Sequence, residues 1–357
     1  PWHSVGEHRS PWWAAFARRV QRRRGILALA SVALLLGLSA PLLRLETGMP
    51  SISVLPKDEQ AREGYEALAT RMGPGAPGPI QVIVPADGDP AAVAEAVAAT
   101  PGVAMTYPPQ PGAGGSHLIT AITAFDPSSE AIMGVVASLR DRLPSQVLVG
   151  GPVAENYDLD QALRSTAPLV IGIVLVLGFL LLLFALQAVF IAFAGVVFNL
   201  LSVGAAFGVG ALAFQHGWLA GPLGFESQGY LTSWAPLFFF ALVFAISMDY
   251  TVFLLASARE HFERSNDPDE AIEGSLAHTG RPIVAAAGVM IAVFYTFALA
   301  GTLPMKEMGL ILGTAVLVDA FIVRLVLVPA VMSMVGRRAW WLPRWADRVL
   351  PDVRFAH

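Results

Sequence analysis

Three charged residues lie inside long apolar stretches of this 357-residue chain. Asp249 stands in the stretch Ala235–Ala256, and both Asp319 and Arg324 stand in the last stretch. A charge at the centre of a bilayer costs about 2.5–3.5 kcal/mol on insertion scales, so each one needs a reason. A carboxyl group away from water holds its proton more tightly, and a neighbouring Arg loosens that hold. The three residues therefore indicate a relay that loads and releases a proton.

The spacing of these residues suggests how they meet. Asp319 and Arg324 are five apart, about 140° around an α-helix, so we expect no pair along their own helix. The two stretches run in the same direction, and a rise of about 1.5 Å per residue places all three groups in one layer. We expect Arg324 to bridge to Asp249, with Tyr250 passing or orienting the proton. A static ion pair that only fixes helix packing is the alternative.

Other polar residues give weaker signals. Ser247, Asn199 and Tyr295 are candidates for supporting the relay, although hydrogen bonds between helices explain Asn199 and Tyr295 as well. The seven histidines show no metal-ligand spacing, there is no cysteine, and no phosphate-binding loop of the G-x-x-x-x-G-K-[ST] type occurs. We therefore expect no cofactor and no metal, with protons as the coupling ion, and no enzymatic site, because no pairing of a nucleophile with a base is apparent.

Composition places the chain in a membrane. It is 55% hydrophobic and 14% charged, with a mean hydropathy of +0.59, whereas soluble domains carry about a quarter charged residues. A net charge of -4 argues against a nucleic-acid partner, because binding phosphates needs clustered Lys and Arg in excess. The sequence begins at Pro1 and not at Met, so we expect it to be part of a longer protein.

Six apolar stretches are long enough to cross a bilayer, which takes about 20 residues of helix. They are Ile26–Leu43, Pro168–Leu186, Val189–Phe214, Ala235–Ala256, Pro282–Ala300 and Met308–Val335. A secretory signal peptide is the alternative for the first, but no cleavage site of the A-x-A type follows it. Arg and Lys gather before the first stretch, in 257–281 and after the last, and such loops face the cytoplasm. We expect both ends inside and 44–166 outside.

The segment 44–166 is too long for a loop and predicts an α+β domain. Apolar alternation and helical patterns follow in the order β-α-β-β-α-β, which is typical of a ferredoxin-like (split βαβ) fold. The expected strands are Ile80–Val84, Val103–Tyr107, Leu118–Phe125 and Val147–Val149, and the expected helices are Pro90–Ala99 and Ser128–Arg142. Gly and Pro cluster at 73–79 and 108–115, which favours mobile loops that gate a groove.

The resulting organisation has five parts. A basic cytoplasmic segment (1–24) precedes the first crossing (25–43), the external domain (44–166), a five-helix bundle (167–335) and a cytoplasmic tail (336–357). Within the bundle, 257–281 predicts an amphipathic helix along the membrane surface, because Asp267 can cap it, Pro268 suits its first turn and Gly280 can stop it. A solvated hairpin that only connects two crossings is the alternative.

Several segments together resemble the C-terminal half of MmpL-type transporters of the RND superfamily. They are Ser247-Met248-Asp249-Tyr250-Thr251-Val252-Phe253-Leu254-Leu255, Asn199-Leu200-Leu201-Ser202, Ala277-His278-Thr279-Gly280-Arg281-Pro282-Ile283, Asp319 with Arg324 and Pro329, and Trp340-Trp341-Leu342-Pro343-Arg344-Trp345. One departure is the turn Phe184-Ala185-Leu186-Gln187-Ala188, where relatives usually carry an Arg-Ser pair. Its absence leaves the cytoplasmic anchoring of that turn open.

The resemblance implies a function. Asp249 and Tyr250 match the proton-relay pair of such a half, and their partner would be a second Asp-Tyr pair on an N-terminal half of the same transporter. It further implies a bacterial inner (plasma) membrane location, a porter role for the external domain, and proton-driven export of lipids or other hydrophobic compounds. Assembly of several copies stays open.

Two other classes of function are compatible with these helices. A lipid- or sterol-sensing, receptor-like protein would bind lipid without titrating carboxylates. An accessory to protein translocation resembling SecD and SecF would keep the proton motor and change the cargo, although its motifs differ from those quoted above.

Overall fold

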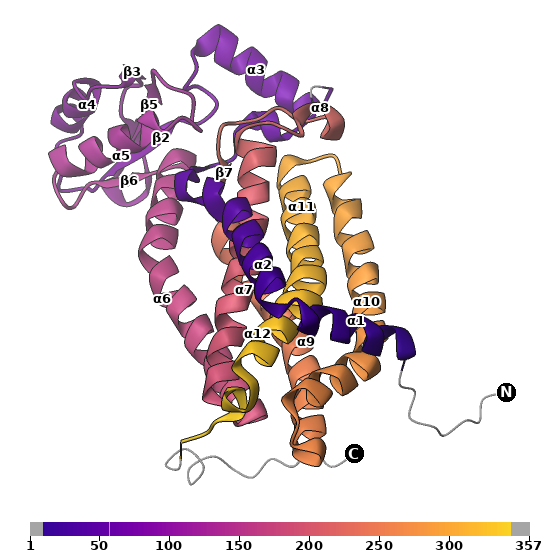
Figure 1. Cartoon of the computed structure of the whole chain (residues 1–357). Coiled ribbons are helices and arrows are strands. Elements are labelled where there is room, and N and C mark those ends of the chain that lie inside the picture. The colour runs from indigo at the N-terminus through magenta and orange to yellow at the C-terminus, as the bar shows by residue number, and fades with distance from the viewer. Residues whose placement is uncertain (1–9, 57, 344–357) are drawn as a thin grey trace.

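The computed structural model describes residues 10–56 and 58–343. Within that part, six helices are long and apolar enough to cross a membrane, and they stand side by side as a bundle (Figure 1). Their bounds are α2 (Arg24–Ser39) with η1 (Ala40–Arg44), α6 (Pro152–Leu186), α7 (Val189–Gly210) with η4 (Ala211–Gln215), α9 (Ala235–Ser265), α10 (Pro268–Ala298), and α11 (Leu303–Val318) continued by η5 (Asp319–Leu327), α12 (Val328–Val335) and η6 (Gly336–Trp340). The six predicted crossings are therefore confirmed as helices.

The last of these helices is the core of the bundle. In its most apolar window 78% of the residues are buried, against 17% for α2, α6 and α10. α11 packs against α7, α9 and α10, which together surround it. Charged side chains on α11 and η5 are thereby shielded from the surroundings.

Small residues on α7 allow the close packing that the sequence suggested. A methyl group at Gly208 would lie 1.8 Å from the carbonyl oxygen of Leu38, and one at Gly204 would lie 2.9 Å from Oγ of Ser39. Both neighbours belong to α2, so the two backbones touch. The interpretation of these glycines as packing residues is confirmed.

The segment 257–281 does not form a separate surface helix, which corrects the prediction. Its first part continues α9 to Ser265, and its second part is the start of α10. The expected cap is present, because Asp267 Oδ1 accepts hydrogen bonds from the amides of Asp269 and Glu270 at 2.9 and 3.5 Å. Gly280, however, lies inside α10, which runs on to Ala298. The two helices therefore form one long hairpin.

A helix that the sequence analysis treated as a basic linker lies across this hairpin. α1 (Pro11–Arg22) crosses the bundle at the end opposite the α/β domain (Figure 1) and packs on α10. Arg18 forms an ion pair with Glu273, and Gln21 donates to the carbonyl of Asp269 at 2.8 Å. Gly280 gives the Trp13 ring its place, since a methyl group there would lie 2.5 Å from the ring.

Replacing Gly280 by valine is expected to displace α1 from α10, because the new side chain would overlap the Trp13 ring. The chain has no cysteine, so a bis-maleimide cross-link between Gln21→Cys and Asp269→Cys reports the contact cleanly. We expect its yield to fall several-fold. Gly288→Val is the matched control, because a methyl group there meets nothing within 4 Å. An unchanged yield in Gly280→Val would show that α1 is not seated by this glycine.

The turn before α7 is anchored despite lacking an Arg-Ser pair. Arg259 from α9 donates to the carbonyls of Leu186 and Gln187 at 3.3 and 3.5 Å, and its guanidinium lies 5.8 Å from the centre of the Trp340 ring. The question left by the sequence is thus answered by an arginine from another helix. The tail residues Arg344–His357, including the last residues of the quoted tail motif, lie outside the described residues.

The segment between α2 and α6 forms an α/β domain on one end of the bundle (Figure 1). Its elements are β1 (Thr47–Gly48), η2 (Ile52–Val54), α3 (Gln60–Met72), β2 (Ile80–Val84), α4 (Pro90–Ala98), β3 (Val103–Thr106), β4 (Gln110–Pro111), η3 (Ala113–Gly115), β5 (His117–Thr123), α5 (Ala131–Arg142) and β6 (Leu148–Gly150). The main sheet has the order β3-β5-β2-β6, and every pair along it is antiparallel. The apolar faces of α4 and α5 share one buried core with the sheet.

The loop 216–234 joins this domain to the bundle. It contains α8 (Ala220–Leu223) and β7 (Leu231–Thr232), and β7 pairs in parallel with β1. Arg62 on α3, which is 8% exposed, donates to Glu226 of the loop and to Glu66, at 2.8 Å in each case. These hydrogen bonds raise the pKa of Arg62, so it stays charged. The helices and the domain are thus linked through more than their covalent connections.

Candidate functional site

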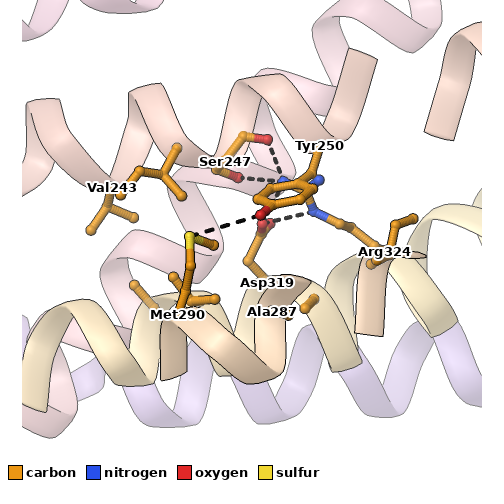
Figure 2. A pocket seen from close by; sticks show the side chains of 12 residues that line it. Val243, Ser247, Tyr250, Ala287, Met290, Asp319 and Arg324 are labelled. Carbon is orange, nitrogen blue, oxygen red and sulfur yellow. Dashed lines mark hydrogen bonds and ion pairs between the residues drawn. The ribbon is translucent and has the colours of Figure 1, made fainter. Parts of the chain in front are cut away.

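Asp319 and Arg324 form a buried ion pair within one helix, which the sequence analysis did not expect. Nε of Arg324 donates to Oδ2 of Asp319 at 2.8 Å, and Nη2 lies 2.5 Å from the same oxygen (Figure 2). The residues are 5% and 1% exposed. The prediction failed because it assumed α-helical geometry, whereas 319–327 is a π-helix. A π-helix repeats every five residues, so residues five apart come to lie one above the other.

Arg324 also connects η5 to α9. Its Nη2 donates to the backbone carbonyl of Ser247 and, at 3.1 Å, to the Ser247 hydroxyl. The Tyr250 ring lies over the guanidinium, 5.0 Å from its central carbon, which is within the range of a cation–π contact. The Tyr250 hydroxyl points to Sδ of Met290 on α10, at 3.8 Å. Three helices therefore meet at one cation.

The network continues to α7 and is incompletely satisfied. The Ser247 hydroxyl donates to Oδ1 of Asn199 at 2.6 Å. Three buried atoms of this cluster have no hydrogen-bond partner among the described residues, namely Asn199 Nδ2, Asp319 Oδ1 and Arg324 Nη1. Beside the pair lies a cavity of about 10 Å³, which is the order of size needed for one water molecule. Such unpaired atoms are uncommon and mark functional clusters more often than packing alone.

Asp249 lies apart from this cluster, so the expected bridge from Arg324 to Asp249 is wrong. Asp249 is exposed on the surface of the bundle, whereas Ser247 and Arg324 are buried. The reason is helical geometry, because residues two apart lie about 200° around an α-helix and cannot both face α11. Asp249 still acts electrostatically on Arg324. Tyr250, the next residue, lies between these two charges in the sequence and reaches the inner one.

Tyr295 is placed elsewhere. Its hydroxyl is 3.4 Å from the Thr314 hydroxyl, which joins α10 to α11 as the sequence interpretation of an interhelical hydrogen bond proposed. A methyl group at Gly313 would lie 2.7 Å from the Tyr295 ring, so the ring packs flat on α11. No contact between Tyr295 and Arg324 is seen among the described residues. Of the supporting candidates, Ser247 and Asn199 thus join the cluster and Tyr295 does not.

Two buried charged residues were missed in the sequence. Lys306 and Glu307 are 6% and 1% exposed and lie in the first turns of α11, which begins at Leu303 and not at Met308. A signal was present, since Thr302 is a good N-cap type and Pro304 suits the first turn of a helix. The prediction that no other charge lies inside a crossing is therefore wrong.

An apolar pocket of about 340 Å³ opens between four helices at the end of the bundle that carries the α/β domain. Its walls come from α2, α6, α7 and α9, and include Ile171, Phe207 and Phe240. Its polar rim contains the Asp160–Arg164 ion pair, with an N–O distance of 2.7 Å, and Ser233, which donates to Asp160 at 3.1 Å. Among the described residues that line it, none is His, Cys, Met or Tyr.

Comparison with known proteins agrees with the sequence resemblance. A family model described as the MMPL family matches residues 57–354. The heme uptake protein MmpL11 of Mycobacterium tuberculosis H37Rv is 38% identical over 360 residues, which cover 96% of this chain and 37% of that protein. The mycolic acid-containing lipids exporter MmpL11 of Mycolicibacterium smegmatis is 37% identical, covering 97% of this chain and 38% of the relative.

A third relative shares a shorter region. The trehalose monomycolate exporter MmpL3 of Mycobacterium tuberculosis is 35% identical over 218 residues, which cover 58% of this chain and 23% of that protein. The chain therefore spans well under half the length of these relatives.

Proposed function

Because this chain belongs to the MMPL family, we propose that it forms the C-terminal half of a transporter that exports lipids or other hydrophobic compounds across the inner membrane, driven by protons. The observation that carries the proposal is the Arg324–Asp319 pair, which is buried in the central helix with unpaired atoms beside a water-sized cavity. A pair that served packing alone would be expected to have its remaining atoms satisfied.

The proposed arrangement in the membrane follows from charge and topology. Arginines at both ends of the chain favour a cytoplasmic location for those ends, which puts the α/β domain outside the inner membrane. The β-α-β-β-α-β order and the strand order β3-β5-β2-β6 support its assignment as a ferredoxin-like porter domain. These assignments are part of the proposal.

The proposed relay has an inner and an outer carboxylate. Asp319 takes a proton on Oδ1, which has no protein donor among the described residues, and this loosens its attraction to Arg324. Arg324 then shifts toward the Ser247 carbonyl and the Tyr250 ring, both on α9. Because α9 also carries Asp249, a change at Asp319 moves the helix that presents the second carboxylate. Proton transfer is thereby coupled to a displacement of helices.

Asp249 explains why a second half is required. On the surface of the bundle it neighbours Phe253, and Phe238 lies on the same exposed face, with exposed fractions of 50% and 52% for the two rings. A carboxylate on such an apolar face is costly against lipid. We propose that the N-terminal half covers this face and supplies a polar partner for Asp249, as the Asp-Tyr resemblance implies.

The pocket between α2, α6, α7 and α9 is the proposed lipid site. Its apolar walls suit an acyl chain, and the Asp160–Arg164 rim suits a polar headgroup. One MmpL11 relative is named for heme uptake and another for lipid export. The lining lacks the usual iron-ligating side chains among its described residues, which favours lipid at this position.

Filling this pocket is expected to slow export. Ala167→Phe would occupy space between the apolar walls, and we expect export of an acylated trehalose to fall several-fold. Thr166→Phe is the matched control, because Thr166 is exposed on the same helix and does not line the pocket. Export is measured as the appearance of labelled lipid at the outer leaflet. Equal rates in the two variants would exclude the pocket from the substrate path.

The proposed function itself is tested by reconstituting the full-length protein in vesicles with an internal pH-sensitive dye. Proton movement that accompanies transfer of acylated trehalose supports the transporter. Lipid binding without any proton flux would instead favour a sensor, and stimulation of protein translocation would favour an accessory role. Hemin in place of the lipid tests whether the naming of the heme relative extends to this protein.

A further inference from the structure

Glu307 is a buried carboxylate that the proposed relay does not use. It lies near the start of α11, at the end of the bundle that carries the α/β domain (Figure 1), and is 1% exposed. Neither of its carboxylate oxygens has a hydrogen-bond partner among the described residues. The hydroxyl and backbone of Thr232 on β7 face the carboxylate, but their geometry falls short of a hydrogen bond. An ionised carboxylate in this position would therefore be poorly stabilised.

The neighbouring cation does not compensate this charge. Lys306 precedes Glu307 in α11, but its Nζ donates to the backbone carbonyl of Leu223 on α8 at 2.6 Å. No ion pair between the two side chains is present in the described part of the chain. A buried carboxylate without an ionic partner or a hydrogen-bond donor is most stable with a proton bound, so Glu307 has the properties of a proton-binding site.

A single side chain connects Glu307 to the α/β domain. Tyr230, in the loop 216–234, interacts electrostatically with both Glu307 and Asp126. Its hydroxyl donates to the carbonyl of Met49 at 2.6 Å, and its ring packs on Gly48, where a methyl group would lie 2.8 Å away. Burial raises the pKa of Tyr230 to about 12, so the phenol stays neutral. It therefore responds to charge on Glu307 without titrating itself.

On the other side of Tyr230, Asp126 organises the entry to α5. Its Oδ1 accepts hydrogen bonds from the backbone amide and the hydroxyl of Ser128, at 2.9 and 2.5 Å. Its Oδ2 accepts one from the Tyr65 hydroxyl on α3, at 3.0 Å. A change in the field at Tyr230 thus acts on a carboxylate that holds two parts of the α/β domain together.

We propose that Glu307 is a second proton-binding site, loaded from the extracytoplasmic side, and that Tyr230 transmits its charge state to the Asp126 turn of the α/β domain. In the loading step the carboxylate takes a proton from hydronium, forming an O–H bond and leaving water; release reverses the step. The groups that set its response are Lys306 on its own helix, with Tyr230 and Thr232 on the facing loop. The extracytoplasmic assignment rests on the proposed function, whereas proton binding by Glu307 does not.

The first experiment detects the proton directly. Infrared difference spectra between acidic and neutral buffers are recorded on the full-length protein in membranes, in the region of the carboxylic acid C=O stretch. We expect Glu307→Gln to remove one band of the wild-type protein, and the matched control Glu46→Gln, which changes an exposed carboxylate, to retain it. Identical difference spectra for Glu307→Gln and the wild type would overturn the proposal.

The second experiment tests transmission through Tyr230. Hydrogen–deuterium exchange at the Ser128 amide, corrected for the intrinsic pH dependence of exchange, is expected to change several-fold between acidic and neutral buffers. The change should disappear in Glu307→Gln and in Tyr230→Phe, which keeps the ring on Gly48, and persist in Glu46→Gln. If Tyr230→Phe keeps the full response, transmission through Tyr230 is refuted. Neither readout requires transport, so absence of proton-driven export would refute the proposed function and leave these results standing.

Discussion

Replacement of Asp319 by alanine is expected to destabilise the helix bundle by about 3–5 kcal/mol, the usual cost of removing one partner of a buried ion pair. Arg324 would remain buried with only Ser247 and the Tyr250 ring to stabilise its charge. Proton-coupled flux should fall to background, because the proposed inner proton site is gone. The measurements are the thermal unfolding midpoint of the purified protein and proton flux into vesicles.

Two further variants separate the structural effect from the proton effect. Asp319→Asn keeps the shape of the side chain, so we expect a smaller loss of stability and the same loss of flux. Asp249→Ala removes an exposed carboxylate and should leave the unfolding midpoint close to that of the wild type. An Asp319→Ala protein as stable as the wild type would show that Arg324 is compensated by other groups.

Replacement of Asp249 by asparagine is expected to abolish proton-coupled export while leaving folding and membrane level unchanged. Asp249 is exposed and forms no hydrogen bond or ion pair among the described residues, so its loss leaves no buried group unpaired. Its ability to carry a proton is the property that asparagine lacks. Export of acylated trehalose and the amount of protein in the membrane are measured together.

The matched control is Glu260→Gln, an exposed carboxylate further along α9 that pairs with Arg264. This variant should export at the wild-type rate, because the proposed relay does not include it. Normal export by Asp249→Asn would remove Asp249 from the relay and would leave Asp319 as the only carboxylate supported by its position.

The α/β domain and the crossings could be predicted closely because their patterns are local. Strand β2 was predicted with its observed bounds, Ile80–Val84, since alternating burial along a strand follows directly from alternating residue types. Helix α4 begins at Pro90 as predicted, because Asp89 caps it and accepts from the amides of Ala91 and Ala92. Runs of about 20 apolar residues likewise identify membrane helices without any knowledge of their neighbours.

The hairpin at 257–281 shows where local reasoning fails. Asp267 signals the start of a helix, and this was correct, but Gly280 signals a helix end only where its neighbours permit one. In the folded chain Gly280 serves the approach of the Trp13 ring on α1, a residue distant in sequence. The same glycine has two possible roles, and only a tertiary contact distinguishes them.

The sequence by itself determined that Asp249, Tyr250, Asp319 and Arg324 share one layer of a membrane bundle, because composition and helical rise suffice for depth. Only the tertiary structure decided who pairs with whom. Pairing depends on rotation about each helix axis, and the π-helical turn at 319–327 changes that rotation without a signature in the residue pattern. It brings Arg324 onto Asp319, while the ordinary α-helical turn of α9 directs Ser247 inward and Asp249 outward.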